Sequence, residues 1–230
     1  KRAWLPRIAA GECFVCVGLS EPDSGSDLAS IRTRAERVDG GWRIEGRKVW
    51  TSYAHMAHLM NLFARTTPFS KEDRHGGVTQ FIVDLKLPGI TIRKIEDMTT
   101  NSHFCEVWYD NVRVPVENMV GAEGGAFKQT MRQLEHERGG IDRLVSNYAL
   151  SRIALERADR TDPVVRQRIA ALETAYRIGR ILVVREVLHQ APAGFSAATK
   201  CFCTEHEAHV ADFVASVLGP EATLWDDVTK

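Results

Sequence analysis

The feature that most constrains this 230-residue chain is a single change of pattern near Gly121–Gly125. Before this point, short runs of β-branched and aromatic residues alternate with turn residues, which is typical of strands. After it, apolar residues recur every three or four positions, which is typical of amphipathic helices. Because strands and helices occupy separate halves, we expect an α+β fold by segregation. A β domain is expected over residues 1–120 and a helical domain over residues 121–230.

The first half is predicted to form a β-sandwich or a barrel-like sheet. Asp39-Gly40-Gly41 separates the first two apolar runs and is a hairpin signal. Gly, Pro, Asn and Asp separate the remaining runs, and many short strands at close spacing favour sandwiches and barrels. The expected strands are residues 31–35, 42–50, 59–66, 78–84, 90–93, 104–109 and 112–114.

The second half is predicted to form most of an antiparallel bundle of three long helices. The first runs from about residue 126 to 158, with a break expected at Gly139-Gly140. The second begins at Asp162-Pro163, an N-cap residue followed by proline at the first helical position. The third runs from about residue 197 to 218 and ends at Gly219-Pro220. The apolar stripe of the second helix comprises Val165, Ile169, Leu172, Tyr176, Gly179, Val183 and Val187.

Composition excludes several classes of protein. Thirty basic and thirty acidic residues give zero formal charge, which argues against a nucleic-acid binder driven by phosphate attraction. No apolar run approaches the roughly 20 residues of a membrane helix, so no transmembrane segment is expected. Five cysteines, an odd number, favour reduced thiols and a cytoplasmic location. The first residues carry no initiator Met and no signal-peptide core, and we expect a piece of a longer chain.

One cysteine and histidine cluster has to be weighed as a metal site. Cys201, Cys203, His206 and His209 fall on the third predicted helix, where Cys203 and His206 share a face. A zinc site needs ligands that this spacing does not supply. We therefore expect no metal, and a helix with buried cysteine and solvated histidine.

Three other clusters could carry chemistry. The loop of residues 19–27 follows an apolar strand and offers backbone N–H groups and hydroxyls to an anion or a polar ring edge. The segment 46–52 ends a strand with Trp50-Thr51-Ser52, an aromatic face beside two hydroxyls. Taken alone, the loop could also be an ordinary Ser/Asp/Gly turn. Trp50 could equally be a core tryptophan at the end of a strand.

The third cluster is residues 134–140 of the first predicted helix. Two adjacent glycines inside a helix cost about 1 kcal/mol each relative to alanine, so close approach of a helix or ligand is expected. Glu135 and Arg138 are three residues apart and share a face, whereas Glu137 points elsewhere. A solvated charged face is the commoner meaning of such a run.

Taken in order, these clusters resemble the acyl-CoA dehydrogenase family. The resemblance covers nearly all of the chain. The matching segments are Leu5-Pro6 with Gly11-Glu12, Ser20-Glu21-Pro22-x-Ser24-Gly25-Ser26-Asp27, Gly46-Arg47-Lys48-Val49-Trp50-Thr51-Ser52, Phe104-x-x-Val107, Val112-x-Val114-Pro115-x-x-Asn118-x-x-Gly121, Leu134-x-x-Glu137-Arg138, Lys200 and Leu218-Gly219-Pro220.

The resemblance implies an FAD-dependent enzyme that oxidises an acyl-CoA thioester to the trans-2-enoyl-CoA. It implies that Glu137 removes the α-proton while hydride leaves the β-carbon for the flavin N5. The residues implied to bind FAD are Leu19, Ser20, Ser26, Trp50, Thr51 and Ser52. The residues implied to bind the acyl-CoA substrate are Ser26, Glu135 and Arg138.

The same resemblance defines partners and alternatives. Electron transfer flavoprotein is the expected electron acceptor, and the assembly is expected to be a homotetramer or a heteromer. The family's N-terminal helical domain and extreme C-terminus have no counterpart here, so we expect a fragment or a subunit whose site a partner completes. The alternatives are an acyl-CoA oxidase or flavin-dependent hydroxylase on the same fold, or a non-catalytic partner subunit of a heteromeric dehydrogenase.

Overall fold

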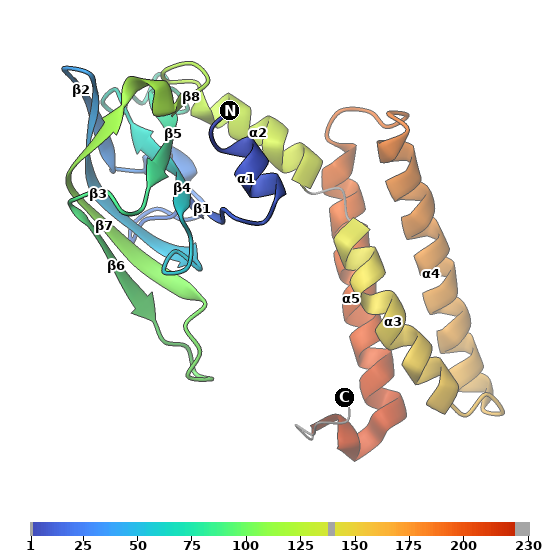
Figure 1. The fold of residues 1–230 in the computed structure, drawn as a ribbon. Helices are drawn as coiled ribbons and strands as arrows, with labels where there is room; N and C mark the ends of the chain where they lie inside the picture. The colour runs from blue at the N-terminus through green and yellow to red at the C-terminus, as the bar shows by residue number, and fades with distance from the viewer. Residues whose placement is uncertain (1, 138–140, 224–230) are drawn as a thin grey trace. The chain divides into compact units, whose positions relative to one another are not determined.

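The computed structural model describes residues 2–137 and 141–223 (Figure 1). The strands are β1 (Val15–Gly18), β2 (Arg34–Val38), β3 (Gly41–Ser52), β4 (Leu59–Arg65), β5 (Val78–Asp84), β6 (Ile90–Ile95), β7 (Phe104–Pro115) and β8 (Met119–Val120). The α-helices are α1 (Leu5–Ala9), α2 (Ala126–Glu137), α3 (Ile141–Arg157), α4 (Pro163–Val187) and α5 (Phe195–Leu218). Contacts divide the chain into two units, residues 1–131 and 132–230. We call them the sheet unit and the helical unit.

The α+β fold predicted from the sequence is confirmed. The strands form one mixed sheet in the order β6-β7-β3-β2-β4-β5-β8, and β1 adds to β4 in parallel. The predicted hairpin is present, because β2 pairs antiparallel with β3 from Val38 and Gly41 outward. The end strands β6 and β8 do not pair with each other within the described part of the chain, so the sheet is open and not a closed barrel.

Two predicted strand assignments are wrong: the strand expected at residues 31–35 lies at Arg34–Val38, and two expected strands are one. Residues 104–109 and 112–114 form the single strand β7, although Asp110-Asn111 reads as a turn. The pairing with β3 steps from Tyr109–Gly46 to Val112–Ile44, so two residues of β7 oppose one residue of β3. Asn111 takes a φ of +52°, which asparagine tolerates better than most residues. The turn signal therefore marks a β-bulge inside a continuous strand.

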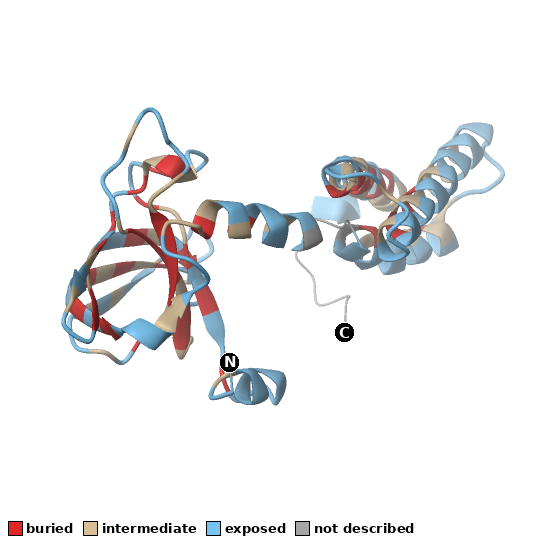
Figure 2. Ribbon diagram, turned by 90° about the horizontal axis from the view of Figure 1, so that it is seen from above, coloured by how far each residue is buried: buried red, intermediate tan, exposed pale blue. Residues whose placement is uncertain are grey.

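The sheet unit has a dense core. Trp42, Phe81 and Val107 are each at most 1% exposed and belong to one cluster of buried apolar side chains. Trp42 and Phe81 pack edge to face with ring centroids 5.4 Å apart. Figure 2 shows buried residues along the strands of this unit. The core holds the strand ends in fixed positions, which is what a binding site requires.

The helical unit is built from α3, α4 and α5, with successive helices running in opposite directions (Figure 1). Asp162 caps α4 as predicted, accepting a hydrogen bond from the Val164 N–H at 2.7 Å. Gly179 allows α3 to approach α4 closely, because a Cβ there would lie 2.8 Å from Leu144 Cδ1. The break predicted after the first helical segment separates α2 from α3, and Gly139-Gly140 itself lies outside the described residues.

Candidate functional site

The first two sequence clusters lie side by side in the sheet unit. Leu19 and Ser20 follow β1, and residues 48–52 form the end of β3. The Val49 N–H donates to the Ser20 carbonyl at 2.9 Å, and Lys48 Nζ donates to the Leu19 carbonyl at 2.9 Å. Two segments nearly thirty residues apart in the chain thus form one surface.

A buried ion pair lies behind this surface. The Lys48 ammonium contacts Glu21 Oε1 at 2.8 Å, and the side chains are 0% and 6% exposed. The Glu21 carboxylate also accepts the backbone N–H groups of Arg32 at 2.6 Å and Thr33 at 2.9 Å. Every one of these contacts favours the ionised carboxylate, and the pair is well satisfied for a buried one.

The environment shifts the pKa of both partners downward. Burial raises the pKa of Glu21, but the charge and hydrogen bond of Lys48 and the two backbone donors outweigh it, and the pKa lies below its usual range. Burial lowers the pKa of Lys48 to about 8, against the opposing effect of Glu21. Both groups are therefore charged at neutral pH.

An apolar hollow of about 750 Å³ lies beside these segments. Trp50 lines it and is 59% exposed, with Phe104 packed against the indole at 6.0 Å between ring centroids. The residues lining the hollow are Phe14, Val15, Cys16, Val17, Leu19, Ser20, Val49, Trp50, Ser52, Tyr53, Met56, Ala57 and His58. A hollow of this size and lining fits a flat, partly polar ligand of cofactor size.

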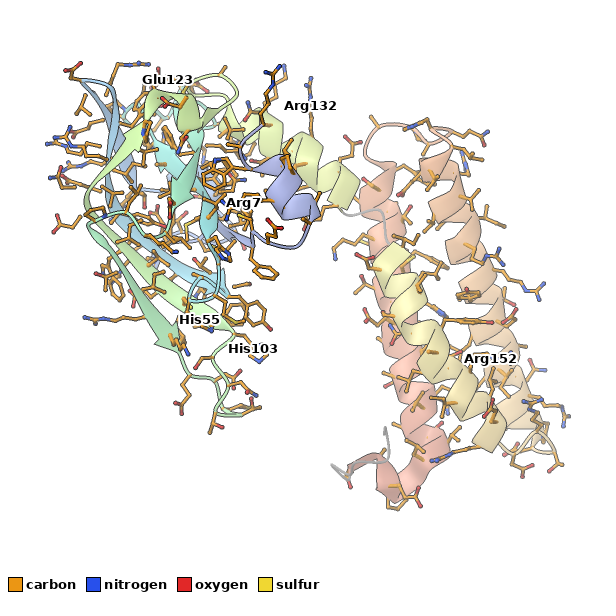
Figure 3. The ribbon with its side chains drawn as sticks, in the orientation of Figure 1. Arg7, His55, His103, Glu123, Arg132 and Arg152 are labelled. Carbon is orange, nitrogen blue, oxygen red and sulfur yellow. The ribbon has the colours of Figure 1, made fainter. Side chains whose placement is uncertain are left out.

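The backbone around the hollow is strained where aromatic side chains enter it. Trp50 has a φ of +58° and Tyr53 a φ of +51°, values that bulky residues rarely adopt. The Tyr53 backbone N–H donates to the His103 carbonyl at 2.8 Å, and the Tyr53 hydroxyl lies 2.9 Å from His103 Nδ1. His103 and His55 lie at the same end of the sheet unit (Figure 3). Such local strain is often concentrated at ligand sites.

The groups that line the hollow provide the test of whether a flavin fits here. Thr51 is not among them: it is 1% exposed, and its hydroxyl has no hydrogen-bond partner among the described residues. Leu19, Ser20, Trp50 and Ser52 do line the hollow and offer an aromatic face with hydrogen-bonding groups beside it. With an exposed indole on one side and Ser20 and Ser52 on the hollow, the residues present fit a tricyclic ring with polar edges.

Ser26 is separate from the hollow. It is exposed in the loop between Glu21 and Leu28 and does not line the hollow. Its neighbour Ser24 is buried and donates to the Asp27 carbonyl at 2.6 Å, which shapes the loop. Four of the six predicted cofactor residues, Leu19, Ser20, Trp50 and Ser52, therefore line the hollow, whereas Thr51 is buried behind it in β3 and Ser26 lies apart in the loop.

Sequence reasoning missed the apolar wall of the hollow. Phe14, Val15 and Val17 lie on or next to β1 and are exposed, although an apolar run of this kind reads as core. The alternation of exposed Val15 and Val17 with buried Cys16 is the signal that could have identified the wall. Exposed valines on one face of a strand indicate a surface that a ligand or another segment covers.

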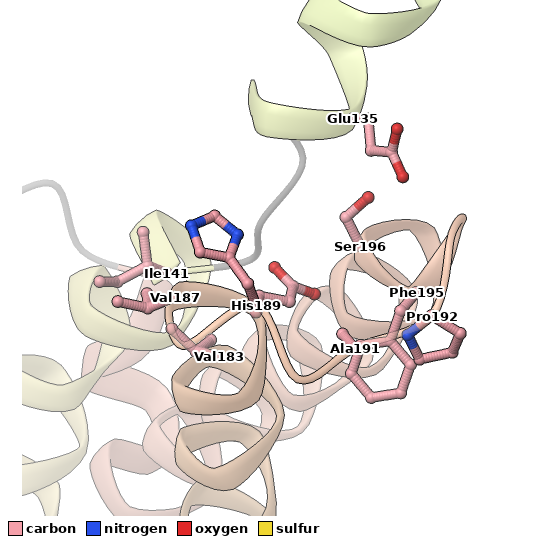
Figure 4. A pocket seen from close by; sticks show the side chains of 10 residues that line it. Glu135, Ile141, Val183, Val187, His189, Ala191, Pro192, Phe195 and Ser196 are labelled. Carbon is pink, nitrogen blue, oxygen red and sulfur yellow. The ribbon is translucent and has the colours of Figure 1, made fainter.

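The third cluster lies at the end of α2. Glu135 accepts a hydrogen bond from the Gly194 N–H at 3.1 Å and borders a pocket of about 380 Å³ in the helical unit (Figure 4). Glu137 is the last residue of α2 and is exposed. Arg138 lies outside the described residues. The roles assigned to these three residues therefore stay predictions.

The cysteine and histidine cluster differs from expectation in one residue. Cys203 is buried, as predicted, but His206 is also buried, at 5% exposure, near the ring of Tyr176. Burial lowers the pKa of His206, with a smaller contribution from His209. Cys201 and His209 are exposed on the same helix. Among the described residues, no group of three or more His, Cys, Asp and Glu side chains could hold a metal ion.

The chain is similar to proteins of one family. Residues 16–112 match the middle domain of acyl-CoA dehydrogenases. The acyl-CoA dehydrogenase FadE34 of Mycobacterium tuberculosis is 46% identical over 59% of this chain and 19% of its own length. The acyl-CoA dehydrogenase FadE26 of the same organism is 32% identical over 97% of this chain and 60% of its own length.

A solved structure agrees with these relatives over nearly the whole chain. The ChsE4–ChsE5 complex of Mycobacterium tuberculosis aligns with a TM-score of 0.85 at 30% identity, over 97% of this chain and 60% of that chain. The chain thus spans 60% or less of the relatives described here. Within the described residues, no helix has the length and hydropathy needed to cross a membrane. Both units align with the same relatives, and the chain belongs to the acyl-CoA dehydrogenase family.

Proposed function

We propose that the protein containing this chain is an FAD-dependent acyl-CoA dehydrogenase. The observation that carries the proposal is the apolar hollow beside the exposed indole of Trp50, which Leu19, Ser20 and Ser52 also line. An indole face, an apolar wall and several hydrogen-bonding groups are the combination that a flavin ring requires. FAD, when bound, supplies the two-electron acceptor that takes the hydride from the β-carbon of the acyl chain.

The residues of the sheet unit would hold that cofactor. Leu19, Ser20 and Ser52 would face the polar edge of the ring, Trp50 would pack against it, and Thr51 would use its hydroxyl. Ser26 would bind the FAD phosphate and part of the substrate, from its exposed position in the loop. The separation of Ser26 from the hollow is consistent with binding a different part of a long cofactor.

The residues at the end of α2 would serve the substrate. Glu137 would take the α-proton, and the electron pair of the broken Cα–H bond would form the Cα–Cβ double bond as the β-hydride leaves. Glu135 and Arg138 would hold the CoA part of the thioester. The hydrogen bond from Gly194 fixes the Glu135 carboxylate in place, which supports a role in positioning.

Assembly and electron transfer form a separate part of the proposal. The similar ChsE4 and ChsE5 proteins were solved as a complex, which supports a heteromer here, and a homotetramer is the alternative. Electron transfer flavoprotein would accept the electrons. Light scattering on the full-length protein, alone and with candidate partner chains, would measure the assembly.

The test is to titrate the full-length protein with FAD and then with a panel of acyl-CoA thioesters under anaerobic conditions. Bleaching of the flavin by one thioester is the expected result. Subsequent exposure to oxygen separates a dehydrogenase, which reoxidises slowly, from an oxidase or hydroxylase. A protein that does not bind FAD would contradict the proposal and favour a non-catalytic partner subunit.

The role of Glu137 is tested with a matched pair of variants. Glu137→Gln should lower the rate of flavin bleaching about 100-fold or more, because it removes the base, and should leave FAD affinity unchanged. Glu156→Gln, an equally exposed substitution on α3, should leave both unchanged. Bleaching by Glu137→Gln at the wild-type rate would exclude Glu137 as the base.

A further inference from the structure

Lys48 and Glu21 form a buried ion pair that the reaction does not use. Both side chains lie below the surface, at 0% and 6% exposure, directly behind the segments that line the hollow. Burying two charges costs several kcal/mol per ion, and apolar residues of similar volume often stabilise a fold equally well. Stability alone is therefore a weak reason for the pair, and its contacts indicate another role.

The ammonium of Lys48 fixes the orientation of one peptide unit. Lys48 Nζ binds the Leu19 carbonyl at 2.9 Å and so draws that oxygen into the interior. No peptide bond in the described chain is cis, and in a trans unit the carbonyl and the following N–H point in opposite directions. The Ser20 N–H is thus directed away from Lys48. It has no hydrogen-bond partner within the described chain, and Leu19 and Ser20 both line the hollow.

Both ends of this arrangement are anchored. Glu21 holds the ammonium at 2.8 Å and is itself fixed by the backbone N–H groups of Arg32 and Thr33. The Ser20 carbonyl accepts the Val49 N–H at 2.9 Å, which ties the loop to β3. Gly18 leaves room for Met60, because a Cβ there would lie 2.5 Å from Met60 Sδ, and it would be in ordinary contact with Lys48 Cγ at 3.4 Å. The free N–H is therefore a preorganised donor.

We propose that Lys48 and Glu21 are positioning residues that aim the Ser20 N–H at the flavin ring and set the electrostatic potential that the ring experiences. The inference rests on the proposed function and goes beyond it, because neither residue belongs to the predicted cofactor set. The Lys48 charge stabilises an electron-rich ring, and the opposite charge of Glu21 partly offsets that stabilisation. In a buried, low-dielectric site such charges act strongly.

The test uses the full-length protein and measures two quantities that do not depend on turnover, the dissociation constant of FAD and the midpoint potential of the bound flavin. Lys48→Met should weaken FAD binding at least tenfold and make the potential more negative. Glu21→Gln removes the counterion that raises the pKa of Lys48, so the potentials are compared at acid pH, where the lysine keeps its charge; there the variant should make the potential more positive. The control Lys86→Met, at an exposed position after β5, should change neither quantity.

The opposite signs distinguish positioning from a purely structural role. If the pair only maintained the fold, both variants would loosen the site and shift the potential in the same direction, and that result would overturn the inference. If Lys48→Met does not fold, the neutral double variant Lys48→Met with Glu21→Gln is used. It should bind FAD at least tenfold more weakly, and wild-type affinity there would also overturn the inference. A wild-type protein that binds no FAD would instead contradict the proposed function itself.

Discussion

In the sheet unit, Trp42, Phe81 and even Lys48 are at most 1% exposed, whereas in the helical unit Ile178, Ile181 and Val184 are 43% to 61% exposed. The core of the sheet unit joins most of its strands, while the described helical unit has the smaller cluster of Leu144, Val183 and Cys203, with Val210 and Phe213 also buried on α5. The segments that line the hollow are thus held by their own core. The helices depend more on local signals and on the small set of residues between them.

The largest effect that this comparison predicts is the loss of a core aromatic side chain. Phe81→Ala should lower the free energy of unfolding of the sheet unit by about 3–5 kcal/mol, because it leaves a cavity in a dense core. Ile181→Ala on α4 should change stability by no more than about 1 kcal/mol, since that side chain is 61% exposed. Urea denaturation followed by circular dichroism measures both. Equal losses would contradict the comparison.

The sequence predicted the strands and helices of both units better than it predicted the features that depend on pairing between distant segments. Strand alternation, the Asp39-Gly40-Gly41 turn and the Asp162-Pro163 helix start are local signals, and the structure follows each of them. The bulge at Asn111 was missed because the same residue type serves turns and bulges, and only the pairing partner β3 decides between them.

The candidate site shows the same limit. Trp50, Thr51 and Ser52 could be recognised as a motif, and Trp50 and Ser52 line the hollow with Leu19 and Ser20. The Lys48–Glu21 pair could not be recognised, because its members lie 27 residues apart and each reads as a surface charge. Burial and pairing of charges depend on the tertiary fold, so no local pattern reports them.

A second, pH-dependent effect is predicted for the sheet unit. The pKa of Glu21 lies below its unfolded value near 4.5, so between the two values the unfolded chain binds more protons. The stability that Glu21 contributes is therefore complete above about pH 4.5 and is lost as the pH falls through the folded pKa. Urea denaturation from pH 7 to pH 3 should show a smaller loss of stability for Glu21→Gln than for the wild type.

The control for this measurement is Glu117→Gln, at an exposed carboxyl in the same unit. It should retain the wild-type loss of stability on acidification. If Glu21→Gln lost as much stability between pH 7 and pH 3 as the wild type does, the buried pair would not be the source of acid sensitivity.

The smallest effect is predicted where the helical unit depends on a local signal. Asp162→Ala removes the side-chain oxygen that accepts the Val164 N–H, and it should lower the free energy of unfolding by about 1 kcal/mol. Asp162→Ser, which can still cap the helix, should recover most of that loss. Thermal unfolding of the full-length protein, followed at the helical signal near 222 nm, compares the two variants. An Asp162→Ala loss as large as that of Phe81→Ala would mean that α4 is held by its cap as firmly as the sheet unit is held by its core.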